Sequence, residues 1–233
     1  MIKLKTNSGK TAWINHFPVK HHSDLVKWED QSRAQLGQDL FMLTELDFKC
    51  SGYFVEFGAT DGVSLSNTWL LEKMFAWNGI LAEPARCWHH QLKLNRQAAI
   101  DEHCVWMNSG LSLRFNETPC AELSTIDTYS NNDYHSASRA TGHHYDVKTI
   151  SLNDLLAKHN APQQIDYLSI DTEGSEFDIL RNFDFERYDI KVITCEHNFT
   201  PNQNKIFELL TSHGYVRKYV DLSSFDDWYV REL

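Results

Sequence analysis

The sequence predicts an α/β fold, in which helices cover both faces of a mostly parallel sheet. Several short apolar runs rich in strand-forming residues end in glycine or acidic residues, as at residues 53–57 and 165–170. Amphipathic helical patterns follow these runs, and such alternation is typical of strand-helix-strand units. The chain has 233 residues, which is enough for one α/β domain with a large core.

The first 30 residues differ from the rest of the chain. They are mixed and polar, so we expect residues 1–30 to form an N-terminal arm with little regular structure, and the domain to occupy 31–233. Apolar residues then fall at helical spacing over 31–46. Gln38 and Asp39 interrupt this pattern with hydrogen-bonding side chains. They are candidates for binding a cofactor beneath the helix, and a solvated helix face is the alternative.

The stretch from residue 51 to 62 is the main candidate for a ligand-binding turn. An apolar strand pattern stops at Gly58, and a helical pattern follows Gly62, so the backbone can approach a bound molecule closely. A dinucleotide site needs closer glycines than these, and Glu56 at the strand end would repel a diphosphate. A cationic ligand such as S-adenosylmethionine suits Glu56 better. Asp61, in the same turn, is a further candidate for binding it.

A second acid follows the next strand. Glu83 ends the apolar run at 79–83, about one strand-helix-strand unit after Glu56. In nucleotide-binding folds an acid at this position accepts hydrogen bonds from the ribose hydroxyls. Glu56 and Glu83 together are therefore a more specific signal for such a ligand than either acid alone. The alternative for Glu83 is a stabilising charge at a helix N-terminus that begins with Pro84.

The remaining patterns alternate as the fold requires. Helices are expected at 64–77 and 85–97, from Ser151 onward, up to about Asn182 after Gly174, and at 201–213. Strands are expected at 100–107, 111–115, 123–126, 147–150, 190–194, 214–220 and 225–230. The end of the third strand would border the adenine ring, which makes Val105 a candidate contact. A polar tract at about 127–146 is expected to be a loop or lid, either functional or merely flexible.

Acidic residues gather at two later strand ends. Asp171 and Glu173 follow the strand at 165–170, and Glu196 and His197 follow the strand at 190–194. Because adjacent parallel strands end at the same edge of a sheet, these four side chains should lie near Glu56. Clustered carboxylates repel one another, so such a cluster favours a functional site.

Composition narrows the classes of partner. The net charge is −10 and there is no basic run, which argues against a nucleic-acid substrate. No apolar run reaches the length of a membrane span, and the first residues lack a signal peptide's apolar core. Five cysteines without a C-x-x-C pair fit a reducing compartment. We therefore expect a cytoplasmic protein. The sequence carries no signal for its oligomeric state.

Five stretches together resemble the FkbM family of S-adenosylmethionine-dependent O-methyltransferases. They are Gln-Leu-Gly-Gln-Asp at 35–39, Phe-Val-Glu-Phe-Gly-Ala-Thr-Asp-Gly at 54–62, Ser-Asn-Thr through Gly-Ile-Leu-Ala-Glu-Pro at 66–84, Asp-Tyr-Leu-Ser-Ile-Asp-Thr-Glu-Gly-Ser-Glu at 166–176, and Glu-His-Asn at 196–198. The resemblance implies a class I methyltransferase (Rossmann-like) fold with a seven-stranded sheet, one strand of which is antiparallel. It also implies methyl transfer to a hydroxyl group of a sugar, glycan or polyketide-type product.

The resemblance also assigns roles to residues. It puts Glu56 and Gly58 in the cofactor loop and Glu83 at the ribose. It places four residues on the side of the site where the reaction occurs: Asp171, Glu173, Glu196 and His197. The 129–145 tract matches no family motif, so the sequence does not identify the acceptor.

Two mechanisms remain open from the sequence. Either His197 or Asp171 is the general base, or Asp171 with Glu196, and His197 or Asn198, holds Mg²⁺ or Mn²⁺. Two other classes also remain: an NAD-dependent Rossmann-type enzyme, and a non-catalytic module that binds a sugar. The former needs a third close glycine, which this turn lacks.

Overall fold

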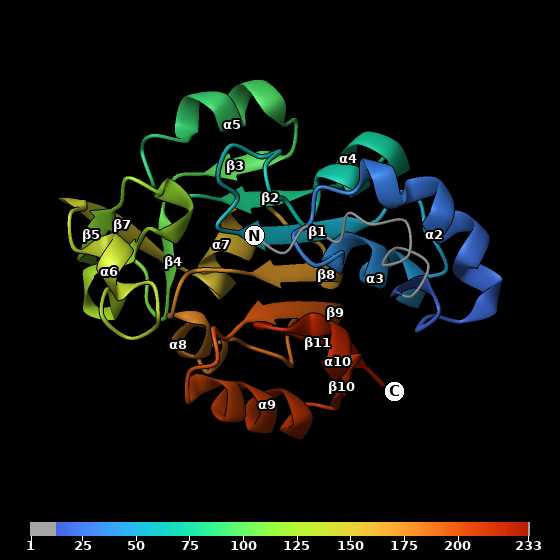
Figure 1. Cartoon of the computed structure of the whole chain (residues 1–233). Helices are drawn as coiled ribbons and strands as arrows, with labels where there is room; N and C mark the ends of the chain where they lie inside the picture. Colours follow the sequence, from blue (N-terminus) through green and yellow to red (C-terminus); the bar gives the residue numbers. More distant parts are fainter. Residues whose placement is uncertain (1–12, 233) are drawn as a thin grey trace.

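A seven-stranded sheet forms the centre of the protein (Figure 1), whose computed structural model describes residues 13–232. The strands are β1 (Tyr53–Phe57), β2 (Asn78–Ala82), β3 (Ala99–Asp101), β8 (Gln164–Ile170), β9 (Asp189–Glu196), β10 (Tyr215–Lys218) and β11 (Asp226–Arg231). Their order is β10-β11-β9-β8-β1-β2-β3. Only β11 runs against its neighbours, β9 and β10. The predicted seven-stranded, mostly parallel sheet is confirmed.

Helices cover both faces of this sheet, as expected. On one face, α7 (Leu152–Lys158), α8 (Glu176–Leu180) and α9 (Asn202–Ser212) pack on inward-pointing side chains of the parallel strands. On the other face lie α2 (His22–Trp28), α3 (Gln38–Glu45), α4 (Trp69–Phe75) and α5 (His89–Asn95). Neighbouring residues of one strand point to opposite faces of the sheet. Val55 packs in the core on the α7, α8 and α9 face, and Phe54 packs in the core on the other face. This is the alternation that a strand buried on both faces must have.

A smaller sheet lies at the carboxyl ends of the parallel strands. Its strands are β4 (Cys104–Trp106), β5 (Ser112–Glu117), β6 (Thr125–Ile126) and β7 (His143–Ser151), in the order β4-β7-β5-β6. The arrowheads of β1, β8 and β9 point toward this sheet and the short helix α6 (Ser136–Arg139) in Figure 1. The strands expected near 111–115 and 123–126 are present as β5 and β6, and they pair in antiparallel fashion. The small sheet therefore stands beside the edge where ligands bind in this architecture.

The third strand differs from its predicted extent. Residues 100–107 do not form one strand: β3 ends at Asp101, and β4 begins at Cys104 and pairs with β7. The Asp101 carboxylate explains the break, because its Oδ1 accepts hydrogen bonds from the backbone N–H of His103, at 3.0 Å, and from the His103 ring. Lys158 and His159 bind the other oxygen. The chain turns around this buried acid and enters the second sheet.

The segment before residue 31 is helical, contrary to prediction, over the part that the structure describes. It comprises η1 (Val19–His21), α2 and η2 (Glu29–Gln31), and residues 1–12 lie outside the described range. Trp13, Ile14, Phe17 and Leu25 are buried against α3. These four apolar residues face the core, although Val19 and Val26 in the same stretch are exposed, and the polar average composition of the segment concealed this packing.

Two helices are shorter than their periodic patterns. The helix expected over 31–46 begins only after Gly37, whose φ is 82°. The helix expected over 64–77 begins at Trp69, because the preceding residues are bound by Glu56. The predicted 127–146 loop is partly regular: it contains η4 (Asp127–Tyr129), α6 and the start of β7, and it buries Arg139.

Within residues 13–232, no helix has both the length and the apolar character that crossing a bilayer requires.

Candidate active site

A large cavity opens between the carboxyl ends of the parallel strands, the small sheet and the N-terminal segment. Its volume is about 1120 Å³. Seven of the residues predicted for the site line it: Glu56, Gly58, Glu83, Val105, Asp171, Glu173 and Glu196. They come from the ends of β1, β2, β8 and β9 and from β4. The expectation that acids at separate strand ends would meet at one edge is therefore met.

Glu83 joins the loops that follow β1 and β2. Its Oε2 accepts a hydrogen bond from the backbone N–H of Thr60 at 2.8 Å, and its Oε1 accepts one from the N–H of Ala85 at 2.7 Å. Burial raises the pKa of Glu83 to about 7, against the effect of these two bonds. A carboxylate has about four lone-pair sites, so two bonds leave acceptor capacity toward the cavity.

Glu56 is enclosed by groups of its own chain. Its carboxylate accepts hydrogen bonds from the backbone N–H of Asn67 at 2.7 Å, from the Ser66 hydroxyl at 3.0 Å and from the Thr68 hydroxyl. Arg96 Nη1 lies 3.6 Å from Glu56 Oε2. The acid therefore fixes the turn at residues 66–68, and its charge is already partly balanced by a buried guanidinium.

Arg96 was not predicted from the sequence. Its side chain is fully buried, and it also pairs with Glu72 at 2.9 Å and donates to the backbone carbonyl of Gly62 at 3.1 Å. It thus ties β1, the turn at 66–68 and α4 together. A single arginine at a helix end carries no pattern that distinguishes it from a surface residue.

Asn67 is a second residue that the sequence did not single out. It is buried and lines the cavity, and its Nδ2 donates to the Ser169 hydroxyl at 2.9 Å. Its Oδ1 has no hydrogen-bond partner among the described residues. A buried acceptor without a partner is costly, so this oxygen is available for a donor on a ligand. The only sequence signal was its place in the Ser-Asn-Thr stretch.

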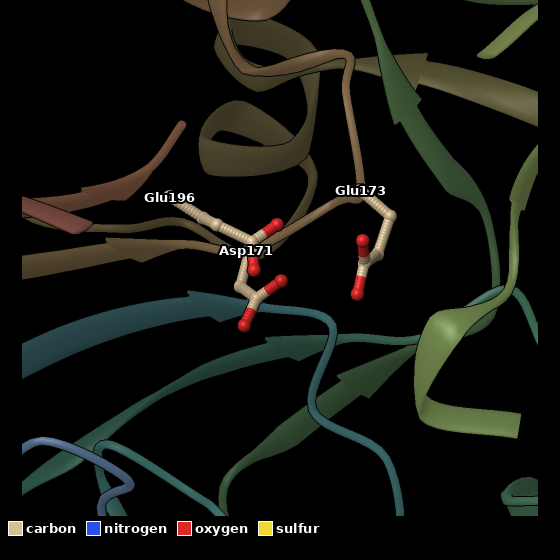
Figure 2. Close-up of side chains that lie close together, drawn as sticks. All are labelled: Asp171, Glu173 and Glu196. Atoms are coloured by element: carbon tan, nitrogen blue, oxygen red, sulfur yellow. The ribbon is translucent and has the colours of Figure 1, made fainter. Parts of the chain in front are cut away.

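Three carboxylates form a cluster on the cavity wall (Figure 2). Asp171 and Glu173 follow β8 and Glu196 ends β9, and one ligand oxygen of each lies within 4.8 Å of the others. Burial raises the pKa of Asp171 to about 7, and the charge of Glu176 adds to the shift. Burial, followed by the charge of Asp171, also raises the pKa of Glu173 and of Glu196 well above the usual range.

The acids of this cluster differ in how many hydrogen-bond partners they have. Glu173 Oε2 accepts hydrogen bonds from Arg139 Nη2 at 2.6 Å and from Asn198 Nδ2 at 3.1 Å. Glu196 Oε2 has no partner in residues 13–232, although the side chain is buried. Glu173 and Asn198 both adopt left-handed backbone conformations, with φ of 59° and 46°. Strained backbone of this kind concentrates at functional sites.

Three further candidates, Gln38, Asp39 and Asp61, do not line the cavity. Gln38 is buried, and its side chain donates to Asp226 Oδ2 at 3.0 Å and accepts from the N–H of Leu36. The Asp61 carboxylate accepts hydrogen bonds from the backbone N–H groups of Val63 and Ser64. Asp39, the neighbour of Gln38, accepts from Ser32 and from Leu40.

His197 contacts α9 and β11 rather than the carboxylate cluster. Its Nδ1 accepts a hydrogen bond from the N–H of Phe199 at 3.0 Å, and its Nε2 lies 3.1 Å from Gln203 Nε2 and 3.7 Å from Asp227 Oδ1. Burial lowers its pKa. The ring therefore borders a separate polar pocket of about 460 Å³ rather than the main cavity.

The arrangement offers two kinds of chemistry on one wall. Glu83 and Asn67 present free hydrogen-bond acceptors near the β1 and β2 loops. The carboxylate cluster presents buried acids whose pKa values favour exchange of protons or binding of cations.

Comparison with known proteins identifies the family. The family model of the methyltransferase FkbM domain matches residues 57–223, which is more than half of the chain. No curated protein matches the sequence. The fold is similar to a crystal structure of methyltransferase FkbM from Methylobacillus flagellatus KT, with a TM-score of 0.52 and 12% identity over 94% of this chain and 57% of that one.

A second solved structure that matches is precorrin-6y C5,15-methyltransferase from Geobacter metallireducens GS-15. The TM-score is 0.43 and the identity 13%, over 82% of this chain and 85% of that one. The present chain spans little more than half the length of the FkbM structure. The structural likeness concerns the fold, and the match of the family model extends from the end of β1 to α10 (Val220–Ser223). The chain belongs to the FkbM methyltransferase family.

Proposed function

We propose that the protein is an S-adenosylmethionine-dependent O-methyltransferase that acts on a hydroxyl of a sugar, a glycan or a related small polar acceptor. The observation that carries this proposal is that one cavity holds both Glu83, with free acceptor capacity, and the carboxylates Asp171, Glu173 and Glu196. One end of the cavity thus suits a nucleoside, and the other end suits removal of a proton.

The residues of the first end fit S-adenosylmethionine. Glu83 would accept hydrogen bonds from the ribose hydroxyls, and the unpartnered Oδ1 of Asn67 would accept from the amino group. Gly58 has no side chain, so the cofactor can approach the backbone closely at this point. Val105 offers an apolar surface to the adenine. Glu56 contributes its charge and holds Asn67 in place through the backbone N–H. When bound, this cofactor supplies a methyl group already activated by its sulfonium.

The protein's own task at the second end is to orient the acceptor and to remove its proton. We assign the general base to Asp171, which lines the cavity, rather than to His197, which does not. The hydroxyl proton of the acceptor passes to the Asp171 carboxylate. A placed base contributes about 10²–10⁴-fold in rate, and correct positioning contributes further.

The outer wall of the cavity supports a polar acceptor. Tyr134 and His135 come from the 127–146 segment and line the cavity, as does Asn198. The Tyr134 hydroxyl donates to Asn198 Oδ1 at 3.1 Å. Such groups recognise hydroxyl-rich molecules by stacking and hydrogen bonding. The five cysteines are all free thiols, which supports a cytoplasmic location because thiols stay reduced there.

Isothermal titration with S-adenosylmethionine and, separately, with NAD tests the cofactor. Transfer of a labelled methyl group to a panel of sugars, nucleotide sugars and glycans tests the reaction. Asp171→Asn should lower turnover by about 10²–10⁴-fold and leave cofactor affinity within a few-fold of the wild type. Glu122→Gln, at the exposed rim of the same cavity, is the matched control and should leave both unchanged. Heat from NAD but not from S-adenosylmethionine would refute the proposal.

A further inference from the structure

We propose that Asp171, Glu173 and Glu196 together bind one divalent cation, Mg²⁺ or Mn²⁺, on the wall of the main cavity. The binding itself follows from the geometry of the three side chains. The use of the cation in catalysis rests on the proposed methyl transfer.

The spacing of the cluster suits an ion. One ligand oxygen from each acid lies within 4.8 Å of the others. Oxygen ligands lie about 2.0–2.6 Å from Mg²⁺, Mn²⁺ or Ca²⁺, so two oxygens on opposite sides of a cation are separated by roughly 4–5 Å. The three carboxylates therefore already span a distance that a single cation can bridge. Figure 2 shows that the side chains converge from the ends of β8 and β9.

A separate observation concerns an unpartnered atom in the cluster. Glu196 is only 7% exposed and lines the cavity, and its Oε2 finds no hydrogen-bond partner among residues 13–232. Leaving a buried acceptor oxygen without a partner is costly, and more costly when its group is charged. A bound cation would satisfy this oxygen directly.

The charge around the cluster is also incomplete. Among the salt bridges of the described part of the chain, one reaches these acids, from Arg139 Nη2 to Glu173 Oε2. Arg139 divides its charge, because its Nη1 binds Asp133 Oδ1 at 2.8 Å. When all three acids are ionised, they face a single shared positive charge in a buried place. A divalent cation would balance the remainder, and Glu173 would still have Oε1 for the ion.

The donor set selects the kind of metal. All three ligands are carboxylates, which Mg²⁺, Mn²⁺ and Ca²⁺ prefer, whereas Zn²⁺ favours imidazole and thiolate. His197, which the sequence suggested as a ligand, faces Gln203 and Asp227 instead. Asn198 uses its Nδ2 and Oδ1 for Glu173 and Tyr134. Three protein ligands leave positions open, so the cation would also bind the acceptor oxygen and lower the pKa of its hydroxyl. Each acid needs only one oxygen for the ion, so the second oxygen of Asp171 would still take the proton.

Titration of the full chain with Mn²⁺, followed by the loss of the free-ion electron paramagnetic resonance signal, tests the site without cofactor or acceptor. We expect saturable binding of one Mn²⁺ per chain, and its release by excess Mg²⁺. Glu196→Gln and Glu173→Gln should each weaken binding by at least about tenfold, by analogy with losses at other metal sites. Glu122→Gln removes an exposed acid from the same cavity wall and should bind Mn²⁺ like the wild type.

Two further measurements keep the outcomes distinct. Thermal melting should show that Glu196→Gln remains folded, because the change removes one of several repelling charges and keeps the shape of the side chain. Failure of the wild type to bind Mn²⁺, or equal affinity in wild type and Glu196→Gln, would overturn the cation site. Mn²⁺ binding without any heat from S-adenosylmethionine would retain the cation site and refute the methyltransferase proposal.

Discussion

The backbone of Gly58 packs directly against the carbonyl group of Asp171. A Cβ atom at position 58 would lie 2.1 Å from the Asp171 carbonyl oxygen, closer than any real contact allows. The loop after β1, which would hold the cofactor, therefore touches the residue that begins the carboxylate cluster. Because β1 and β8 are parallel neighbours, the loop after β1 and the loop after β8 lie side by side. We expect a shift of one loop to displace the other.

Substitution of Gly58 tests this contact. In Gly58→Ala the new methyl group clashes with the backbone carbonyl of Asp171, which cannot move away as a flexible side chain could. The φ of 71° at this position is also unfavourable for alanine. We expect a loss of stability well above the approximately 1 kcal/mol of a left-handed alanine. Cofactor affinity should fall too. Gly110→Ala is the control, since its φ is 81° but no atom lies within 4 Å of its added Cβ. Urea unfolding of both variants checks this, and equal losses would contradict it.

Arg96 should be among the most sensitive positions outside the cavity wall. Arg96→Met leaves Glu56 buried without its cationic partner, whereas Glu72 keeps Lys73 at 2.8 Å, and we expect a cost of about 3–5 kcal/mol of the free energy of unfolding. The double variant Glu56→Gln/Arg96→Met should recover part of this loss, because one uncompensated charge is gone. Arg114→Met, at an exposed position of β5, is the control and should change stability by less than about 0.5 kcal/mol. Strictly additive effects in the double variant would count against the pairing.

The acids at the cavity were predictable because they depend on strand order alone. Asp171 and Glu173 directly follow β8, so the place of this strand in the sheet brings both residues to the edge where the cavity opens. Glu196 and His197 are consecutive, and consecutive side chains point to opposite sides. The sequence therefore placed His197 at the right edge of the sheet but did not show that its ring contacts α9 and β11 rather than the main cavity.

The roles of Arg96 and Asn67 could not be predicted. Arg96 follows α5, and its partners Glu56 and Glu72 stand 40 and 24 positions earlier in the sequence, without a periodic relation to it. Asn67 depends on the hydrogen bond between its backbone and Glu56. Gln38 does not line the cavity for a related reason. A helix before the first strand exposes some positions to the cavity, and Leu36, Gly37 and Leu40 take them instead.

Asp39 should make stability depend on pH. Burial raises its pKa to about 7 in the folded protein, whereas the unfolded value is about 3.9. The folded state therefore holds a proton that the unfolded chain releases, and stability contributed by Asp39 is fully present below pH of about 4 and lost as pH rises to about 7. Glu83, whose pKa is also raised, acts with the same sign, so the wild type must be compared with a single-site variant.

Asp39→Asn removes this titration and keeps the acceptor atom used by Ser32 and Leu40. It should match the wild type near pH 4 and exceed it above pH 7, by an amount on the order of a few kcal/mol. Urea unfolding across this range measures the difference. Asp47→Asn is a control in which the pH effect has the opposite sign. Because Lys20 lowers the pKa of exposed Asp47, the wild type should gain stability relative to this variant as the pH rises. A constant difference between Asp39→Asn and the wild type would show that Asp39 does not titrate in this window.

His197 and Asp171 should respond differently to removal of their titratable groups. His197→Asn offers an acceptor near Nδ1, where the N–H of Phe199 donates, so the chain beyond β9 can keep its course. We expect its turnover to stay within about tenfold of the wild type, because the ring does not reach the main cavity. Asp171→Asn should lose about 10²–10⁴-fold. The pH profile separates a base from a structural residue: the acidic limb of kcat should persist in His197→Asn and vanish in Asp171→Asn. The reverse pattern would assign the proton to His197.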